Sequence, residues 1–277
     1  MTERSEIDLD VIGFWSEVKL EIVKEYASRY STVLAAQENP KLHHVYIEGF
    51  AGAGEHISRR TGEYVKGSPW NALNVVPAFE RYHLIDLKEE RIENLQRIAN
   101  GQPNVHFYTG DCNSILLEKV FPEVQYKDYR RGLCILDPYG LNLNWKVVQA
   151  AGQLRTLDIF INFPVEGMNR NALWRNPDKV PASGIRRMNE FWGEETWKDI
   201  AYDTTANLFG YPEKESNEAI AEAYRQRLMR VAGFKRVPKP MPMRNSTGSV
   251  VYYLFFASQK DVAENIIVHI FKKYSQR

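Results

Sequence analysis

The segment VYIEGFAGAGEH, residues 45–56, runs from a β-branched and aromatic stretch into three glycines, with the acidic Glu48 at the junction. Glycines let a backbone approach a ligand closely, although they are also typical of ordinary turns. In a dinucleotide-binding fold such a loop opens a helix directly, and an acidic residue for the ribose follows about 20 positions later. Here the first helix-start signal, Ser68 with Pro69, follows a polar stretch at 55–67 that we expect to be loop. A nucleoside ligand without phosphates therefore fits better than a dinucleotide.

S-adenosylmethionine is such a ligand, and its parts match the acidic residues that follow. We expect Glu48 and the backbone of the glycine loop to contact the methionine portion. Asp86, which ends the segment RYHLID, suits the ribose hydroxyls because a carboxylate accepts two hydrogen bonds there. Asp111 in TGDCNS suits the adenine amino group, but is equally well placed to cap a following helix. The candidate cofactor-binding residues are Glu48, Gly49, Phe50, Gly52, Gly54, Asp86, Leu87, Asp111 and Cys112.

The segment GLCILDPYGLNLNW places Asp137 at the tip of a short apolar run. Methyl transfer to an exocyclic amine is difficult because the nitrogen lone pair is delocalised into the ring, and an enzyme helps by accepting hydrogen bonds from the amine. Asp137, the carbonyl of Pro138 and the ring of Tyr139 have the types and order for two acceptors and a stacking surface, so these three are the candidate catalytic residues. The structural alternative is an Asp-Pro turn with a packing tyrosine. Asn162, in the segment INFP, either shares the acceptor role or only ends its strand.

These residues need a scaffold that brings distant segments together. Five short runs have the composition of strands: HVYIEGF, RYHLID, VHFYTG, GLCILDPYG and LDIFINFP. Helical patterns lie between strands, as in KEERIENLQRIANG at 88–101, which has acidic residues in its first turn and a closing glycine. Repeated strand, crossover and strand predict a parallel sheet with helices on both faces. Ligands bind at the carboxyl ends of such strands, where the candidate residues above lie.

The two ends of the chain add further elements to this sheet. Apolar residues at helical spacing predict a first helix at about 15–38, within an N-terminal helical extension at 1–40. After a helix at about 216–232, the segment MPMRNSTGSVVYYLFFAS predicts an antiparallel hairpin whose first arm is a sheet edge. A last helix is expected at 261–275.

The segment 165–215 is polar, basic and rich in tryptophan, and predicts an insertion of short helices and loops within one domain spanning 1–277. Such a mixture can follow a nucleic-acid backbone and stack bases. In the alternative, Trp192 and Trp197 form a small accessory core and the arginines are solvated. The candidate substrate-binding residues are Asn162, Arg170, Arg186 and Arg187.

Composition excludes several other classes. The 277 residues carry 36 Lys and Arg against 35 Asp and Glu, a net charge of +1, so a nucleic-acid contact needs a local patch. We expect a cytoplasmic protein without membrane segments, because the start lacks a secretory layout and no apolar run is long enough to span a bilayer. Cys112 and Cys134 are too far apart for a metal motif and are expected to be ordinary buried residues, and the histidines lack ligand spacing, so we expect no metal.

A family resemblance extends this interpretation. The segments YIEGFAGAG, GSP, IDLKEERIENL, GDCN, LDPYGLNLNW, DIFINFPVEGMNRN and YYLFFAS together resemble the three-Cys-motif partner family of bacterial proteins. The first and fifth segments are also similar to adenine-N6 methyltransferases acting on ribosomal RNA. The resemblance implies a class I methyltransferase fold, a mostly parallel seven-stranded sheet with an antiparallel last strand, that binds S-adenosylmethionine. It also implies a companion protein bearing a motif of three cysteines. Amino-methyltransferases usually show Asp or Asn, two prolines and an aromatic residue, whereas DPYG has a single proline.

The leading hypothesis is an S-adenosylmethionine-dependent methyltransferase acting on an amine, with the exocyclic amino group of a nucleobase as the expected target and a nucleic acid as the substrate. The second is a non-catalytic or partner-dependent subunit that uses the same scaffold to bind its three-cysteine companion. A nicotinamide-dependent oxidoreductase is a third, which the delayed helix start disfavours.

Overall fold

The computed structural model describes residues 9–203 and 213–276. The beginning of the expected extension, 1–8, and part of the expected insertion, 204–212, lie outside the described residues. None of the helices in the described ranges has the length and apolar character needed to cross a membrane.

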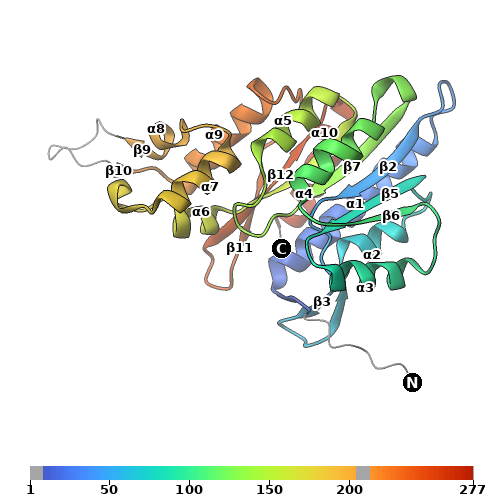
Figure 1. Ribbon diagram of the computed structural model, residues 1–277, viewed down its shortest axis with the longest axis horizontal. Coiled ribbons are helices and arrows are strands. Elements are labelled where there is room, and N and C mark those ends of the chain that lie inside the picture. Colours follow the sequence, from blue (N-terminus) through green and yellow to red (C-terminus); the bar gives the residue numbers. More distant parts are fainter. Residues whose placement is uncertain (1–8, 204–212, 277) are drawn as a thin grey trace.

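A seven-stranded sheet with the order β11-β12-β8-β7-β2-β5-β6 forms the centre of the molecule (Figure 1). Five strands run parallel: β2 (His43–Glu48), β5 (Arg81–Asp86), β6 (Val105–Thr109), β7 (Arg130–Leu136) and β8 (Leu157–Phe163). The other two form an antiparallel hairpin, with β12 (Val250–Ala257) beside β8 and β11 (Met241–Arg244) at the edge. The five expected strands and the terminal hairpin are therefore confirmed.

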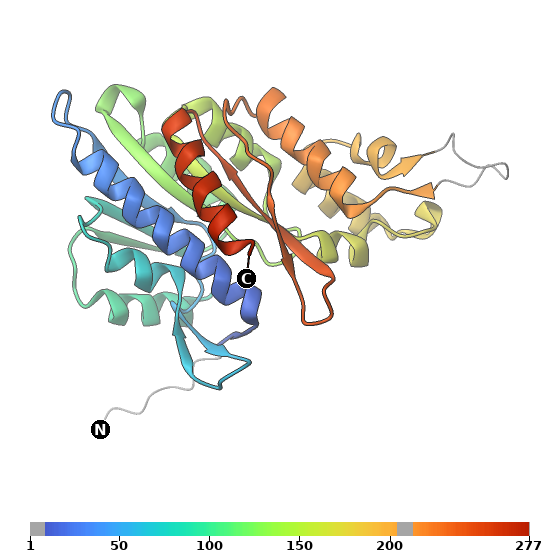
Figure 2. The same ribbon diagram turned by 180° about the vertical axis from the view of Figure 1, so that it is seen from behind.

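Helices cover both faces of the sheet, as the alternation of strands and helices predicts. One face shares a core with α1 (Phe14–Ala35), α2 (Ser68–Leu73), α3 (Glu89–Ala99) and α10 (Asp261–Tyr274). The other shares a core with α4 (Cys112–Ile115), α5 (Trp145–Leu154), α6 (Val165–Asn171), α7 (Ala182–Trp192), α8 (Trp197–Ala201) and α9 (Asn217–Arg230). Figure 2 shows α1 and α10 lying side by side across the first face. Because helices cover both faces of the sheet, the residues of the central strand β2 are buried on both sides: Tyr46 packs on the α1 side and Ile47 on the α4 side.

The polar stretch after the glycine loop is not a loop as expected. It forms β3 (Glu55–Ser58) and β4 (Tyr64–Lys66), which pair antiparallel, and β3 also pairs in parallel with β1 (Val11–Ile12). These strands are too short and polar to show a strand pattern, and the pairing of β1 with β3 joins segments more than 40 residues apart. The small sheet lies between the glycine loop and α2, which is why the helix start is delayed.

The tryptophan-rich segment forms α6, a turn at Pro177–Lys179, α7, α8 and the strand pair β9 (Tyr202–Asp203) and β10 (Glu213–Lys214). Trp192 and Trp197 are buried, and the ring of Trp192 packs 5.6 Å from that of Tyr224 on α9. The accessory-core interpretation of these two tryptophans is confirmed. These two side chains are enclosed, so they serve packing.

Candidate active site

The candidate residues gather at the carboxyl ends of the parallel strands, around two adjoining cavities. One of about 410 Å³, the Asp137 cavity, is lined by Glu48, Asp137 and Asn162 among others. The second, of about 540 Å³, is the Asp86 cavity, which also contains Asp111. The two cavities share Phe50 and Tyr139 in their walls. They lie where the chain, after adding β5 and β6 on one side of β2, returns to add β7 on the other side, the point at which open α/β sheets bind ligands.

Glu48 ends β2 as a buried carboxyl group, 1% exposed, at the base of the Asp137 cavity. The hydroxyl of Tyr46 donates a hydrogen bond to its Oε2 at 2.8 Å, and Ser68 at the start of α2 donates to Oε1. Burial raises the pKa of Glu48 to about 8, against the lowering effect of these two hydrogen bonds. Ser68 was expected to cap α2, but Gly67 occupies the cap position and the hydroxyl of Ser68 serves Glu48 instead.

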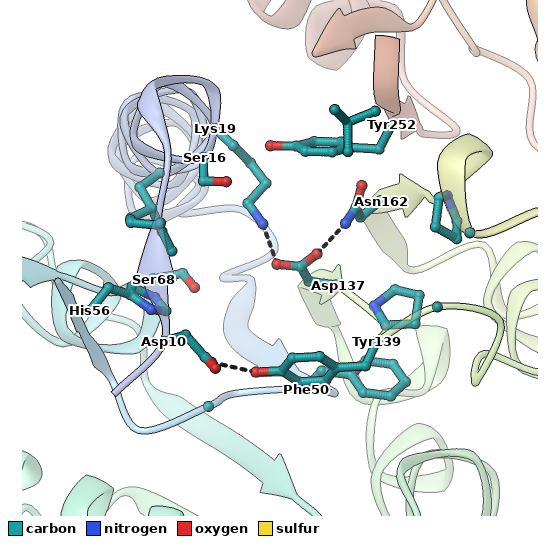
Figure 3. A pocket seen from close by; sticks show the side chains of 18 of the residues that line it. Asp10, Ser16, Lys19, Phe50, His56, Ser68, Asp137, Tyr139, Asn162 and Tyr252 are labelled. Atoms are coloured by element: carbon teal, nitrogen blue, oxygen red, sulfur yellow. Dashed lines mark hydrogen bonds and ion pairs between the residues drawn. The ribbon is translucent and has the colours of Figure 1, made fainter. Parts of the chain in front are cut away.

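Asp137, directly after β7, is held by two neighbours across the cavity (Figure 3). The amide nitrogen of Asn162 donates to its Oδ1 at 2.6 Å, and the ammonium of Lys19 from α1 donates to Oδ2. Burial disfavours the charge on Lys19, but the attraction of Asp137 outweighs it and raises the pKa of Lys19. Asn162 therefore does more than end its strand, because it fixes the orientation of the carboxylate.

Tyr139 separates the two cavities, and its side chain is 52% exposed. Its hydroxyl donates to Oδ2 of Asp10 at 2.5 Å and accepts from Arg91 at 2.7 Å. Burial, followed by the hydrogen bond to Asp10, raises the pKa of Tyr139 to about 12. The ring is thus held as a neutral phenol, with the guanidinium of Arg91 lying over it at 5.3 Å from the ring centroid.

Asp86 fixes the glycine loop by a hydrogen bond to its backbone. The position of Asp86 at a strand end does not predict this role. Oδ2 of Asp86 accepts from the backbone N–H of Gly52 at 2.9 Å, and Oδ1 accepts from Lys88 N–H at 3.0 Å. Gly52 has a left-handed φ of 63°, and a Cβ on Gly49 would lie 2.6 Å from the sulfur of Cys112. The left-handed backbone therefore favours glycine at position 52, and the contact with Cys112 requires it at position 49. Gly54 lines neither cavity, and a Cβ there would meet Ile98 and Leu95 of α3, so it serves packing.

The far side of the Asp86 cavity combines an apolar wall with a helix start. Leu87 is 74% exposed and lines the cavity, while Cys112 is buried beside Gly49. Asp111 accepts hydrogen bonds from the backbone N–H of Ser114 at 2.9 Å, so the helix-cap alternative is confirmed. These bonds lower the pKa of Asp111 although its partial burial acts in the opposite direction. The adenine contact stays a prediction.

The three arginines expected to bind substrate lie in different places, and only two of them line a cavity. Arg170 lines the Asp137 cavity and pairs with Glu166 at 2.9 Å. Arg187 lines the Asp86 cavity and donates to Asn171 at 3.0 Å. Arg186 is exposed and lines neither cavity.

The wall opposite the sheet edge contains residues that sequence reasoning missed. Lys19 comes from α1, Asp10 from the segment before β1, and His56 from β3 (Figure 3). The sequence contains one indication of Lys19: it follows Trp15 by four positions, so a charged residue lies on the apolar stripe of the helix. Asp10 and His56 had none, because no local pattern predicts the small sheet that carries them. Within the described residues, no group of three His, Cys, Asp or Glu side chains is arranged to hold a metal ion.

The sheet topology defines a class I methyltransferase-like fold. Numbered in chain order, the seven strands lie in the order 3-2-1-4-5-7-6, and the antiparallel last strand inserted beside the fifth is the arrangement of that class. A solved structure of protein LPL1258 from Legionella pneumophila, from the family described as DUF519, is similar over 92% of both chains, with 14% identity and a TM-score of 0.50.

Two further solved structures are less similar. A putative methyltransferase from Thermobifida fusca has 14% identity and a TM-score of 0.43, with coverage of 89% of this chain and 80% of that one. A chain of a fibrillarin/Nop5p complex has 11% identity and a TM-score of 0.41, with coverage of 85% and 83%. No family model and no curated protein matches the sequence. At these identities the likeness concerns the fold alone.

Proposed function

We propose that this protein is an S-adenosylmethionine-dependent methyltransferase that acts on an amine, the exocyclic amino group of a nucleobase in a nucleic acid. The observation that carries the proposal is the junction of the two cavities at Phe50 and Tyr139. The Asp86 cavity has the groups that suit a nucleoside, and the Asp137 cavity has the groups that suit an amine. A methyl donor and its acceptor must meet in this way.

The residues around the Asp86 cavity fit S-adenosylmethionine. Each oxygen of Asp86 accepts one hydrogen bond, which leaves a further lone pair on each for the two ribose hydroxyls. The exposed Leu87 offers an apolar wall to adenine, and Asp111 an acceptor for its amino group. Glu48, Phe50 and Gly52 extend the contact towards the methionine portion. When bound, S-adenosylmethionine would supply a methyl group on a positively charged sulfur. Transfer would break the carbon–sulfur bond, with its electron pair left on sulfur, and form a carbon–nitrogen bond, and the acceptor nitrogen would lose one proton.

The residues around the Asp137 cavity fit an amine that must be oriented. Asp137 is fixed by Asn162 and Lys19, and each of its oxygens keeps a lone pair for an incoming N–H group. A fixed acceptor stabilises the positive charge that develops on the nitrogen during transfer. The face of Tyr139 supports stacking of the base that carries the amine.

Calorimetry with S-adenosylhomocysteine tests the cofactor half of this proposal. The wild type is expected to bind in the micromolar range, and Asp86→Ala to lose at least tenfold in affinity. Arg186→Ala is the matched control, because Arg186 is exposed and lines neither cavity. Absence of binding to the wild type at high micromolar ligand would rule out the cofactor.

Methyl transfer tests the acceptor half. Asp137→Ala is expected to reduce turnover by about 100- to 10,000-fold while leaving S-adenosylhomocysteine affinity nearly unchanged. Asp137→Asn, which keeps one acceptor oxygen, is expected to lose less. Mass spectrometry of nucleic acid from cells with and without the active gene identifies the base. Normal turnover by Asp137→Ala would contradict the role given to Asp137.

A second candidate is a partner-dependent subunit that requires the three-cysteine companion. It is supported by the ion pair of Lys19 with Asp137, which neutralises the acceptor, and by the single proline of DPYG. In this case the isolated chain binds S-adenosylhomocysteine but transfers no methyl group until the companion is added. Transfer by the isolated chain at full rate would exclude this candidate.

A further inference from the structure

His56 is a histidine without a hydrogen bond in the wall of the Asp137 cavity. It lies on β3, beside Ser68 and Asp10 and across the cavity from Asn162 (Figure 3). Neither ring nitrogen has a hydrogen-bond partner among the described residues, and Nδ1 is enclosed while Nε2 is not. The buried Nδ1 of His56 shares its lack of a partner with His44 Nδ1 and His83 Nε2, but of these three only His56 lines the cavity, where its Nε2 is open to a bound molecule.

The other basic or acidic groups in this cavity are already engaged. Asp137 is bonded to Asn162 and to the ammonium of Lys19. Glu48 accepts two hydroxyl hydrogen bonds at the base of the cavity. Asp10 accepts from Tyr139 and faces Arg91 at 3.3 Å. Among the described residues that line the cavity and can take up a proton, His56 alone can do so without breaking an existing hydrogen bond or ion pair.

We propose that Nε2 of His56 accepts the proton that the acceptor nitrogen loses during methyl transfer. This inference rests on the proposed function, in which an amine enters the Asp137 cavity. The N–H bond of the acceptor breaks, its electron pair stays on nitrogen, and a new N–H bond forms on the imidazole, which later releases the proton to solvent. His56 thereby acts as a catalytic base, while Asp137 orients the amine.

Burial and the charges around His56 favour the neutral form of its imidazole, which this step requires. Burial lowers the pKa of His56 below its ordinary 6.5, and Lys19 from α1 and Arg91 from α3 act in the same direction. Asp10, which precedes β1, and Asp137, which follows β7, act in the opposite direction and are outweighed. The imidazole is therefore neutral at pH 7 and has a lone pair to receive a proton. Below its pKa the ring is already protonated, so turnover is expected to fall with acidity.

NMR of the protein without ligand tests the state of His56 independently of activity. The imidazole signals that disappear in His56→Gln identify the residue, and their titration midpoint is expected below pH 6.5. A midpoint above pH 6.5 would mean that an acidic partner holds the ring as a cation, and would overturn the proposal. His269→Gln, at an exposed position of α10, is the matched control.

Turnover is measured with a radiolabelled methyl donor and nucleic acid extracted from cells that lack the active gene. His56→Ala is expected to lose about 100- to 10,000-fold in kcat, to keep its affinity for S-adenosylhomocysteine and to regain rate when imidazole is added. An active wild type with an equally active His56→Ala would contradict the role of His56 alone. A weakened S-adenosylhomocysteine affinity without imidazole rescue would mean that His56 binds the cofactor instead. An inactive wild type, with every extract and with the companion present, would remove the proposed function and this inference together.

Discussion

The Asp137 cavity has two walls of different construction. One is the edge of the large sheet, where Glu48, Asp137 and Asn162 lie at the ends of strands that are paired on both sides. The other is made by α1 and the small sheet, in which β1 has only two residues and is joined to the β3 segment by backbone bonds such as Arg59 N–H to Ile12 at 2.8 Å. The strands of the first wall and the helix α1 belong to the buried core, whereas the small sheet is half-exposed. Local opening free energy follows burial and backbone pairing, so the small sheet is expected to open first.

This difference separates two tasks. The sheet edge carries Asp137 and Asn162 on strands that are paired on both sides. The small sheet carries His56, with Asp10 just before it, on short half-exposed strands. Under the proposed function, the first wall would orient the amine and the second could yield to admit the substrate.

Hydrogen exchange gives the largest expected contrast between the walls. Amides of Tyr46–Glu48 are expected to exchange only through global opening, and those of His56–Ser58 through local opening, with rates that differ by about 1,000-fold or more. Mass spectrometry of peptides covering the two segments measures this. Equal protection would mean that both walls belong to one cooperative unit.

Lys19→Met removes the ion pair that joins the two walls. Asp137 then keeps a partly buried charge without its cation, which is expected to cost about 1–3 kcal/mol in the free energy of unfolding. Asp137→Asn in the Lys19→Met background is the control, since removing the carboxylate as well should restore part of the loss. Urea denaturation measures all three. No loss in Lys19→Met would show that the pair contributes nothing to joining the walls.

Glu48 makes the stability of the sheet-edge wall depend on pH. Its pKa is raised from 4.5 to about 8 on folding, so the unfolded chain binds fewer protons and the contribution of Glu48 to stability decreases as the pH rises from 4.5 to 8. The difference in unfolding free energy between the wild type and Glu48→Gln is therefore expected to shift against the wild type over this range. Urea midpoints at pH 5, 6, 7 and 8 measure it. A difference that is constant with pH would contradict the raised pKa.

Tyr139→Phe tests the contact between the walls with the smallest expected effect. The substitution removes the hydroxyl that bonds Asp10 and Arg91 but keeps the ring. Because the site is half-exposed, the free energy of unfolding is expected to decrease by about 0.5–1.5 kcal/mol or less. Thermal denaturation of the variant measures it. Turnover should change little, because stacking depends on the ring. A large loss of turnover would assign a chemical role to the hydroxyl.

The sequence predicts one wall well and the other poorly, for a physical reason. Parallel strands are buried on both faces and leave continuous apolar runs, and their carboxyl ends meet at one edge whatever their separation in the chain. The amino-acid sequence alone therefore suffices to place Glu48, Asp86 and Asp137 together. Gly54 was harder to assign, because a glycine that accommodates α3 has the same sequence signal as one that accommodates a cofactor.

The second wall could not be predicted, because its strands have no local sequence pattern and are recognised only by their pairing in the folded protein. β1 and β3 have only two and four residues and lie far apart in the chain, so neither periodicity nor a turn signal marks their pairing. The lysine on the apolar stripe of α1 was a signal of a different kind, an ionisable group where a hydrophobic one belongs. An ionisable residue at an apolar position indicates a functional or structural site, but it does not show which residue it pairs with.

The long first helix is fastened to the sheet at both ends. Lys19 bonds Asp137 at the carboxyl edge, while at the opposite edge Tyr26 donates to Asp158 at 2.7 Å and Ser31 lies 2.9 Å from the ring of His44. A helix anchored at several points along its length cannot slide to free the carboxylate. Any change in the contact between Lys19 and Asp137 must therefore come from the lysine side chain itself and not from a shift of the helix, while Asn162 keeps its own hydrogen bond to the carboxylate.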